Sequence, residues 1–230
     1  MSVALNYQTI TKKIEEACLV SGRQPGEVNV IAVSKLVTIK QMKEAISIGI
    51  NHFGENKVQD MMEKMKAIDA PVNWHMIGHL QRNKVKYIVD NVSLIHSVDS
   101  LSLIQEIERQ ALKINRVVDC LIQVNVSGEA SKFGIDPTEI DSIMESLEGL
   151  EKINVVGLMT MAPHYDDPEK TRDSFKRLSF LFETCQEKAY HGTHLKYLSM
   201  GMSNDYEIAV QEGANMVRIG SALFGERNYG

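Results

Sequence analysis

The sequence contains eight short apolar runs, and most of the segments between them carry apolar residues at helical spacing. Continuously apolar strands separated by helices are typical of parallel sheets that are covered on both faces. Eight such units are the number that closes a (β/α)8 barrel, and 230 residues are enough to form one. The expected fold class is therefore α/β, with an open, doubly wound sheet as the alternative. The predicted strands are residues 28–34, 52–54, 72–77, 94–98, 117–126, 153–159, 195–200 and 216–219.

No stretch rich in serine, glycine or proline divides the sequence, so we expect one domain over residues 1–230, opened by a helix over residues 1–22. Thr38 and Gln41 fit a capping box, in which two side chains satisfy free backbone N–H groups at a helix start. Apolar residues over 58–68, most of them methionines, repeat at helical spacing. This pattern predicts a buried helix face rather than a metal or redox site.

Composition and charge exclude several classes of partner. With 25 basic and 30 acidic residues the formal net charge is −5, which gives no electrostatic reason to expect nucleic acid or an anionic membrane. No apolar run approaches the ~20 residues that cross a bilayer, and the first residues lack the order of a signal peptide, so we expect a cytoplasmic protein. Cys18, Cys120 and Cys185 stand in apolar stretches and are predicted to be buried free thiols.

Polar residues follow the predicted strands, at the end of a parallel barrel where active sites are found. Lys35 closes the run VIAVSK and is the first candidate. Desolvation at a barrel mouth would lower the pKa of its amine and favour the neutral, nucleophilic form that a Schiff base requires. The alternative is a lysine whose stem is buried and whose charge reaches solvent.

The last two strand exits predict a phosphate site. Residues 201–203 (Gly-Met-Ser) precede a segment of helical period, and residues 220–221 (Gly-Ser) follow the eighth strand. Accessible backbone N–H groups, serine hydroxyls and a helix N-terminus are donors that bind phosphate, and barrels often place such a site after strands seven and eight. Because glycine followed by serine is also ordinary in turns, these segments become informative in combination with Lys35.

Metal and nucleotide sites are not predicted. His75 and His79 are four residues apart but lack the glutamate of a zinc-protease motif and a third ligand at suitable spacing. The sequence has neither a G-x-S-x-G segment nor a Walker phosphate-binding loop. A reactive lysine opposite a phosphate site is therefore the chemistry that these residues favour.

Eight blocks of sequence, spread over nearly the whole chain, stand in one order. They are AVSK (32–35), FGENKVQD (53–60), WHMIGHLQRNK (74–84), IHSVDS (95–100), IQVNVSGEASKFG (122–134), GLMTMAP (157–163), LSMGMSND (198–205) and VRIGSALFGER (217–227). With these blocks the chain resembles the YggS/PROSC family of pyridoxal phosphate homeostasis proteins. So many blocks in a shared order are very improbable by chance.

The resemblance implies a single (β/α)8 barrel of the alanine racemase N-terminal domain type. It implies that pyridoxal 5′-phosphate (PLP) is bound as a Schiff base of Lys35, with Arg218 beside the pyridine nitrogen. Asn56 and His75 would line the pocket of the pyridine ring. The other cofactor-binding residues that it implies are Ser199, Gly201, Met202, Ser203, Gly220 and Ser221. The phosphate would contact the last three of these and the backbone of residues 201–202.

The resemblance also implies a binding protein without an established reaction, involved in PLP supply and in amino- and keto-acid balance. An arginine beside the ring nitrogen opposes its protonation and weakens the electron sink that most PLP chemistry requires. Racemases of this fold take a second base from a tyrosine of an additional β domain. We expect no such domain here, because the sequence ends soon after the eighth strand.

Two other functions remain open at the level of sequence. A weak amino-acid racemase would use His75 or a tyrosine as its second base. A phosphosugar-type barrel enzyme would form the Schiff base between Lys35 and its substrate rather than a cofactor. For the favoured function we expect a monomer whose partners are PLP and the PLP-dependent apo-enzymes that receive it.

Overall fold

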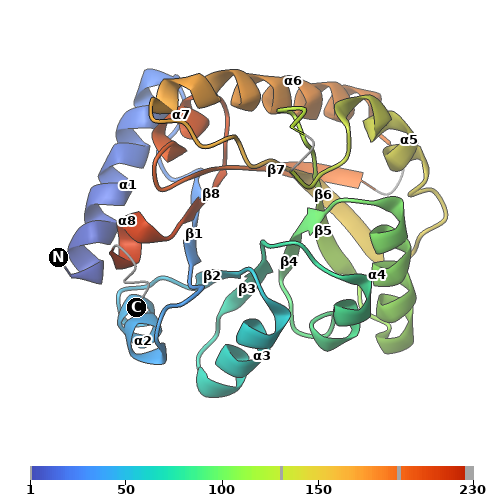
Figure 1. The fold of residues 1–230 in the computed structure, drawn as a ribbon, viewed down its shortest axis with the longest axis horizontal. Helices are drawn as coiled ribbons and strands as arrows, with labels where there is room; N and C mark the ends of the chain where they lie inside the picture. Colours follow the sequence, from blue (N-terminus) through green and yellow to red (C-terminus); the bar gives the residue numbers. More distant parts are fainter. Residues whose placement is uncertain (1, 130–131, 191–192, 226–230) are drawn as a thin grey trace.

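Eight parallel strands form a closed barrel in the computed structural model, which describes residues 2–129, 132–190 and 193–225 (Figure 1). Each strand pairs with the next one along the chain, and β8 pairs with β1 to close the ring. The barrel confirms the predicted fold class and excludes the open sheet. The strands are β1 (Asn29–Val33), β2 (His52–Glu55), β3 (Asn73–Met76), β4 (Leu94–Val98), β5 (Val118–Gln123), β6 (Ile153–Met159), β7 (Thr193–Met202) and β8 (Met216–Ile219).

All eight predicted strands are present, and three of them have the predicted bounds. The predicted strand 117–126 is too long, because β5 ends at Gln123 and Val124 forms only an isolated bridge to Ile135. The predicted strand 195–200 is too short at both ends, and β7 reaches Met202. Residues 130–131 and 226–227, which belong to two of the sequence blocks, lie outside the described residues.

Helices surround the barrel (Figure 1). The leading helix α1 packs against the last two helices, α7 and α8, and so covers the closure between β8 and β1. The predicted capping box is present, since Thr38 and Gln41 bond each other's backbone N–H groups at the start of α2. The α-helices are α1 (Val3–Val20), α2 (Ile39–Ser47), α3 (Val58–Ala67), α4 (Leu101–Ile114), α5 (Ile140–Glu145), α6 (Arg172–Lys188), α7 (Tyr206–Gln211) and α8 (Ser221–Phe224). The described 3-10 helices are η1 (Arg82–Tyr87), η2 (Pro137–Glu139) and η3 (Pro168–Thr171).

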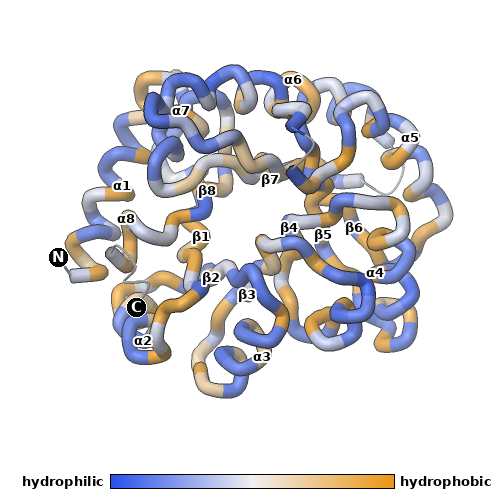
Figure 2. Tube along the Cα trace, in the orientation of Figure 1, coloured by the Kyte–Doolittle hydropathy of each residue, from blue (hydrophilic) through white to orange (hydrophobic). Residues whose placement is uncertain are grey.

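Apolar side chains fill the layer between the barrel and the helices. Figure 2 shows hydrophobic residues along β1 and hydrophilic residues along much of α3 and α6. The methionine-rich face of α3 is part of this core, as predicted, and the three cysteines are buried and free, also as predicted. A second, smaller apolar cluster joins β4, β5, β6 and β8, which can meet only inside the barrel. No helix within the described ranges is both long and apolar enough to cross a membrane.

Candidate functional site

The carboxyl ends of the strands surround a cavity of about 710 Å³. Seven of the ten residues expected to bind a cofactor line it: Lys35, Asn56, Met202, Ser203, Arg218, Gly220 and Ser221. They come from the ends of β1, β2, β7 and β8. Because parallel strands carry their carboxyl ends to one face of a barrel, residues from both ends of the chain meet there.

Lys35 lies in a tight turn directly after β1 rather than on the strand itself. The turn is closed by a hydrogen bond of 2.9 Å from the Val37 backbone N–H to the Ser34 carbonyl. Leu36 has a φ of 62°, a left-handed conformation that a leucine rarely adopts. Such strain persists only where the surrounding structure fixes the backbone. The half-buried Lys35 side chain is thereby presented to the cavity.

A buried ion pair fixes this turn. Lys64 of α3 places its Nζ 2.7 Å from Glu55 Oε1 and donates to the Ser34 carbonyl at 2.6 Å. Ser34 Oγ donates to the same Glu55 oxygen at 2.6 Å. Glu55 is fully buried, and its Oε2 has no hydrogen-bond partner among the described residues. Sequence reasoning missed Lys64, since a lysine on a helix carries no signal of such a contact.

Backbone N–H groups converge at the exits of β7 and β8, and β8 is paired with β1. Ser203 Oγ accepts the N–H groups of Gly220 and Ala222, both at 3.2 Å. Asp205 Oδ1 accepts the Met202 N–H at 2.6 Å and so holds the end of β7, while burial raises the pKa of Asp205. Both amides are bonded to Ser203 Oγ in this structure, and the Ser203 and Ser221 hydroxyls, which line the cavity beside them, are donors that suit a phosphate.

Two glycines let the strand exits pack closely. Gly78 lines the cavity, and a Cβ at this position would lie 2.5 Å from the Asn56 carbonyl oxygen. Gly201 has a φ of 88°, and its Cβ would lie 2.5 Å from the Cβ of Ala209 on α7. Gly201 is not part of the lining, so its evident role in the structure is the close packing of β7 against α7.

Arg218 forms part of the cavity floor, although it is only 3% exposed. Its guanidinium donates to Ser199 Oγ at 2.6 Å and to the Thr160 carbonyl at 2.7 Å. Burial lowers the pKa of Arg218 to about 10, and the charge of Asp205 acts in the opposite direction. Arg218 therefore stays positively charged at neutral pH. Ser199 is fully buried and does not line the cavity.

His75, expected in the ring pocket, is not among the residues that line this cavity. It is 2% exposed inside the barrel, where burial lowers its pKa to about 3. Its Nε2 lies 2.9 Å from His52 Nδ1, and its Nδ1 lies 2.9 Å from His96 Nε2. Because both ring nitrogens are engaged away from the cavity, His75 is not placed to act as the second base of a racemase.

The outer part of the cavity contains residues that the sequence analysis did not assign to the site. His79 Nδ1 lies 2.8 Å from Asp99 Oδ2, and the His79 ring stacks on Phe133 with 4.2 Å between centroids. Both rings line the cavity, as does Tyr165. Within the described ranges, no three His, Cys, Asp or Glu side chains are grouped so as to hold a metal ion.

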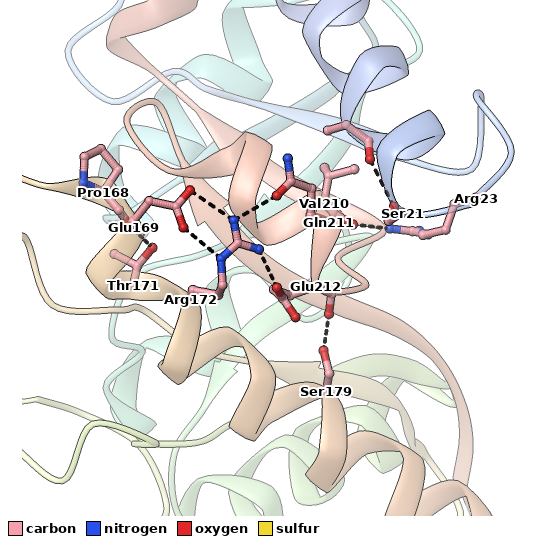
Figure 3. A network of polar contacts seen from close by, with 11 residues as sticks. Ser21, Arg23, Pro168, Glu169, Thr171, Arg172, Ser179, Val210, Gln211 and Glu212 are labelled. Atoms are coloured by element: carbon pink, nitrogen blue, oxygen red, sulfur yellow. Dashed lines mark hydrogen bonds and ion pairs between the residues drawn. The ribbon is translucent and has the colours of Figure 1, made fainter.

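An arginine network holds one wall of the cavity. Arg172, at the start of α6, bonds Glu169 of η3 and reaches Gln211 and Glu212 at the end of α7 (Figure 3). The flanking residues Pro168 and Thr171 line the cavity. The network therefore ties the segment after β6 to the helix that follows β7.

Comparison with known proteins places this geometry in a family. The family model for the alanine racemase N-terminal domain matches residues 7–228. A pyridoxal phosphate homeostasis protein of Aquifex aeolicus (strain VF5) is 40% identical over 230 residues, covering 100% of both chains. Its counterpart in Pseudomonas aeruginosa is 37% identical, covering 100% of this chain and 97% of the relative.

Solved structures support the same family relationship. PipY of Synechococcus elongatus PCC7942, solved with PLP bound, is 33% identical with a TM-score of 0.81, covering 93% of this chain and 100% of PipY. An alanine racemase of Clostridium difficile 630 shares the fold alone, with a TM-score of 0.73 at 16% identity over 99% of this chain and 57% of the racemase. The chain therefore belongs to the pyridoxal phosphate homeostasis proteins, within the wider family defined by the alanine racemase N-terminal domain.

Proposed function

We propose that this protein binds PLP in the cavity at the carboxyl end of the barrel and takes part in PLP homeostasis as a carrier or regulator. The observation that carries the proposal is the single cavity shared by Lys35, Arg218 and the Ser203–Gly220–Ser221 cluster. An amine, a guanidinium and converging phosphate donors match the aldehyde, the ring nitrogen and the phosphate of PLP. PipY, a relative at 33% identity, was solved with PLP bound, which supports PLP binding by this protein.

Each group of PLP has a counterpart among the residues of the cavity. When bound, PLP supplies an aldehyde that reacts with amines, and Lys35 would hold it as a Schiff base. Ser203, Ser221 and the Gly220 N–H would hold the phosphate, with the backbone of residues 201–202 beside them. Asn56 would contact the ring, and Arg218 would face the ring nitrogen. His75 and Ser199 would not contact PLP directly. They would act on it through Arg218.

A binding role is favoured over a catalytic one by the charge on the cavity floor. A positively charged Arg218 opposite the ring nitrogen would keep that nitrogen unprotonated, and this weakens stabilisation of carbanions. Both ring nitrogens of His75 are engaged inside the barrel, so it offers no second base. The relatives from Aquifex aeolicus and Pseudomonas aeruginosa are likewise named for homeostasis and not for a reaction.

The proposal also covers the location, the oligomeric state and the partners of the protein in the cell. The protein would act in the cytoplasm as a monomer, would bind neither nucleic acid nor membrane, and would supply PLP to apo-enzymes that depend on it. A net charge of −5 supports the exclusion of polyanionic partners. Size-exclusion chromatography with light scattering tests the monomer, and transfer of PLP to a purified apo-enzyme, read as regained activity, tests the supply.

The lysine assignment is tested by borohydride reduction of the PLP-loaded protein and peptide mapping of the reduced adduct. The expected adduct is on Lys35, and Lys35→Ala should give a folded, colourless protein. Lys132→Ala is the matched control, because Lys132 donates to the Ala162 carbonyl at 2.9 Å near the exit of β5. An adduct that forms mainly on a lysine other than Lys35 would contradict the assignment.

The phosphate assignment is tested by comparing PLP with pyridoxal, which lacks the phosphate. Charge-assisted hydrogen bonds contribute about 1.5–3 kcal/mol each, so pyridoxal should bind at least roughly tenfold more weakly for each phosphate hydrogen bond that it cannot form. Ser203→Ala should reduce the affinity for PLP and leave that for pyridoxal nearly unchanged. Equal affinities for the two aldehydes would show that the cluster does not bind phosphate.

Arg218 is tested by nitrogen NMR of PLP labelled at the ring nitrogen. In Arg218→Glu the ring nitrogen should become protonated, and its resonance should shift accordingly. PLP should remain bound, because the contacts to Lys35 and to the phosphate are separate. A fully bound cofactor with an unchanged ring-nitrogen resonance would show that Arg218 is not the partner of the ring.

A further inference from the structure

Five polar side chains form a continuous line of hydrogen bonds through the inside of the barrel. Arg218 Nη1 lies 2.6 Å from Ser199 Oγ, and Ser199 Oγ lies 2.9 Å from His96 Nδ1. Two further contacts of 2.9 Å join His96 Nε2 to His75 Nδ1 and His75 Nε2 to His52 Nδ1. In order, the line consists of Arg218, Ser199, His96, His75 and His52.

The line joins the two ends of the barrel. Its members stand on β8, β7, β4, β3 and β2, and the contact between His96 on β4 and Ser199 on β7 crosses the barrel interior. Arg218 lines the cavity at the carboxyl end of the strands, whereas His52 is the first residue of β2, at the opposite end. Only His52 is half-buried, and the other four side chains are buried.

The chemistry of the Arg218 end gives the line of hydrogen bonds a direction. A guanidinium can only donate, so Ser199 Oγ accepts from Arg218. The other contact of this fully buried hydroxyl is His96 Nδ1, so its own proton is satisfied only if His96 Nδ1 accepts it. His96 then carries its proton on Nε2 and donates to His75 Nδ1.

The same reasoning extends to the far end. His75, having accepted on Nδ1, carries its proton on Nε2 and donates to His52 Nδ1. His52 is left with its own proton on Nε2. Every hydrogen bond in the line is therefore donated in the direction away from Arg218. The unprotonated Nδ1 of each histidine faces the Arg218 end of the line. Hydrogen bonds aligned in this way polarise one another and solvate a buried cation.

The pKa shifts along the line indicate that its three histidine rings are neutral. Burial lowers the pKa of His75 to about 3 and that of His96 well below its ordinary value, and the positive charge of Arg218 adds to the effect on His96. Burial also lowers the pKa of His52. Among the charges that act on Arg218 itself is the carboxylate of Asp205. Arg218 is thus the one member of the line that carries charge at neutral pH.

We propose that Ser199, His96, His75 and His52 form a directional relay that holds the Arg218 guanidinium in one orientation and fixes the proton of each histidine on Nε2. The relay goes beyond the proposed function, because it exists in the protein without any ligand. Its members are positioning residues for Arg218. Where Arg218 faces a cofactor ring, the relay connects that contact with His52 at the other end of the barrel.

The test is nitrogen NMR of the ligand-free protein labelled on histidine, which distinguishes a protonated ring nitrogen from a bare one. At neutral pH the expected spectrum shows His75 and His96 neutral, with the proton on Nε2. Ser199→Ala removes the hydroxyl that sets the direction of the hydrogen bonds. In this variant His96 should no longer be present only as the tautomer protonated on Nε2. Ser199→Thr retains a hydroxyl and should preserve that tautomer. A merely structural serine would leave the form of His96 unchanged in both variants.

The far end supplies a second test should Ser199→Ala fail to fold. His52→Gln keeps an oxygen that can accept from His75 Nε2, whereas His52→Phe keeps the ring shape without an acceptor. His75 should keep its proton on Nε2 in both variants, because its Nδ1 still accepts from His96, but its Nε2 resonance should shift in the phenylalanine variant, where the donated hydrogen bond is lost. Rings protonated on Nδ1 in the native protein, or a His75 signal identical in both variants, would overturn the relay.

Discussion

Lowering the pH from about 7 to about 5 should destabilise the folded protein through its buried histidines. His75 and His96 are 2% and 0% exposed, and burial lowers the pKa of each, that of His75 to about 3. In the unfolded chain both regain an ordinary pKa of about 6.5. Below that value the unfolded state takes up protons that the folded state does not bind, so stability falls as the pH falls.

The size of the effect follows from the pKa of His75, which is about 3 in the folded protein and about 6.5 in the unfolded chain. One pKa unit corresponds to about 1.4 kcal/mol. Integrated from about pH 7 to about pH 5, His75 removes about 2 kcal/mol from the free energy of unfolding, and His96, whose pKa is lowered in the same direction, adds to the loss. This is a large fraction of the ~5–15 kcal/mol by which a protein is ordinarily stable.

Urea denaturation at the two pH values measures the difference. Trp74, the single tryptophan, is buried beside His75 and reports unfolding by its fluorescence. His75→Gln should lower stability at neutral pH but remove about 2 kcal/mol of the pH dependence, the contribution of His75. His194→Asn is the control, since His194 is exposed, and should leave the pH dependence unchanged. A loss below about 1 kcal/mol in the native protein would show that the buried rings are protonated after all, and the neutral relay would fail with them.

Three further predictions concern groups around the cavity and in the core. Lys64→Met leaves the buried carboxylate of Glu55 without its cation and should cost about 3–5 kcal/mol of unfolding free energy, whereas Lys12→Met, in an exposed pair with Glu16, should cost less than about 1 kcal/mol. Denaturation curves compare them, and similar losses would contradict the difference in burial. Gly78→Ala should shift the Asn56 backbone, destabilise the fold by about 1–3 kcal/mol and weaken PLP binding in a spectroscopic titration, and wild-type affinity would contradict it. The Cys120 thiol, whose pKa burial raises, should react with a disulfide reagent only after denaturation, and fast native labelling at this residue would refute its burial.

The architecture was predictable because it depends on local patterns. Apolar runs alternating with helical periods specify parallel strands covered by helices, and the number of units specifies closure. Residues at the ends of these runs, such as Lys35, Ser203 and Arg218, could be assigned to one face of the barrel, because all strands in it run the same way. A mistake in a strand bound, as for the range 117–126, leaves that face unchanged.

Contacts across the barrel were decided only by the tertiary structure. The register of β3 and the depth of His75 in the barrel turn its ring toward His52 and His96. His96 and Ser199 are 103 residues apart, and Lys64 reaches Glu55 and Ser34 from a helix. Periodicity specifies which face of an element is buried, but not which buried side chains touch. Which buried side chains touch depends on strand register and on the closure of the barrel, because these set the distances between residues that are far apart in the sequence.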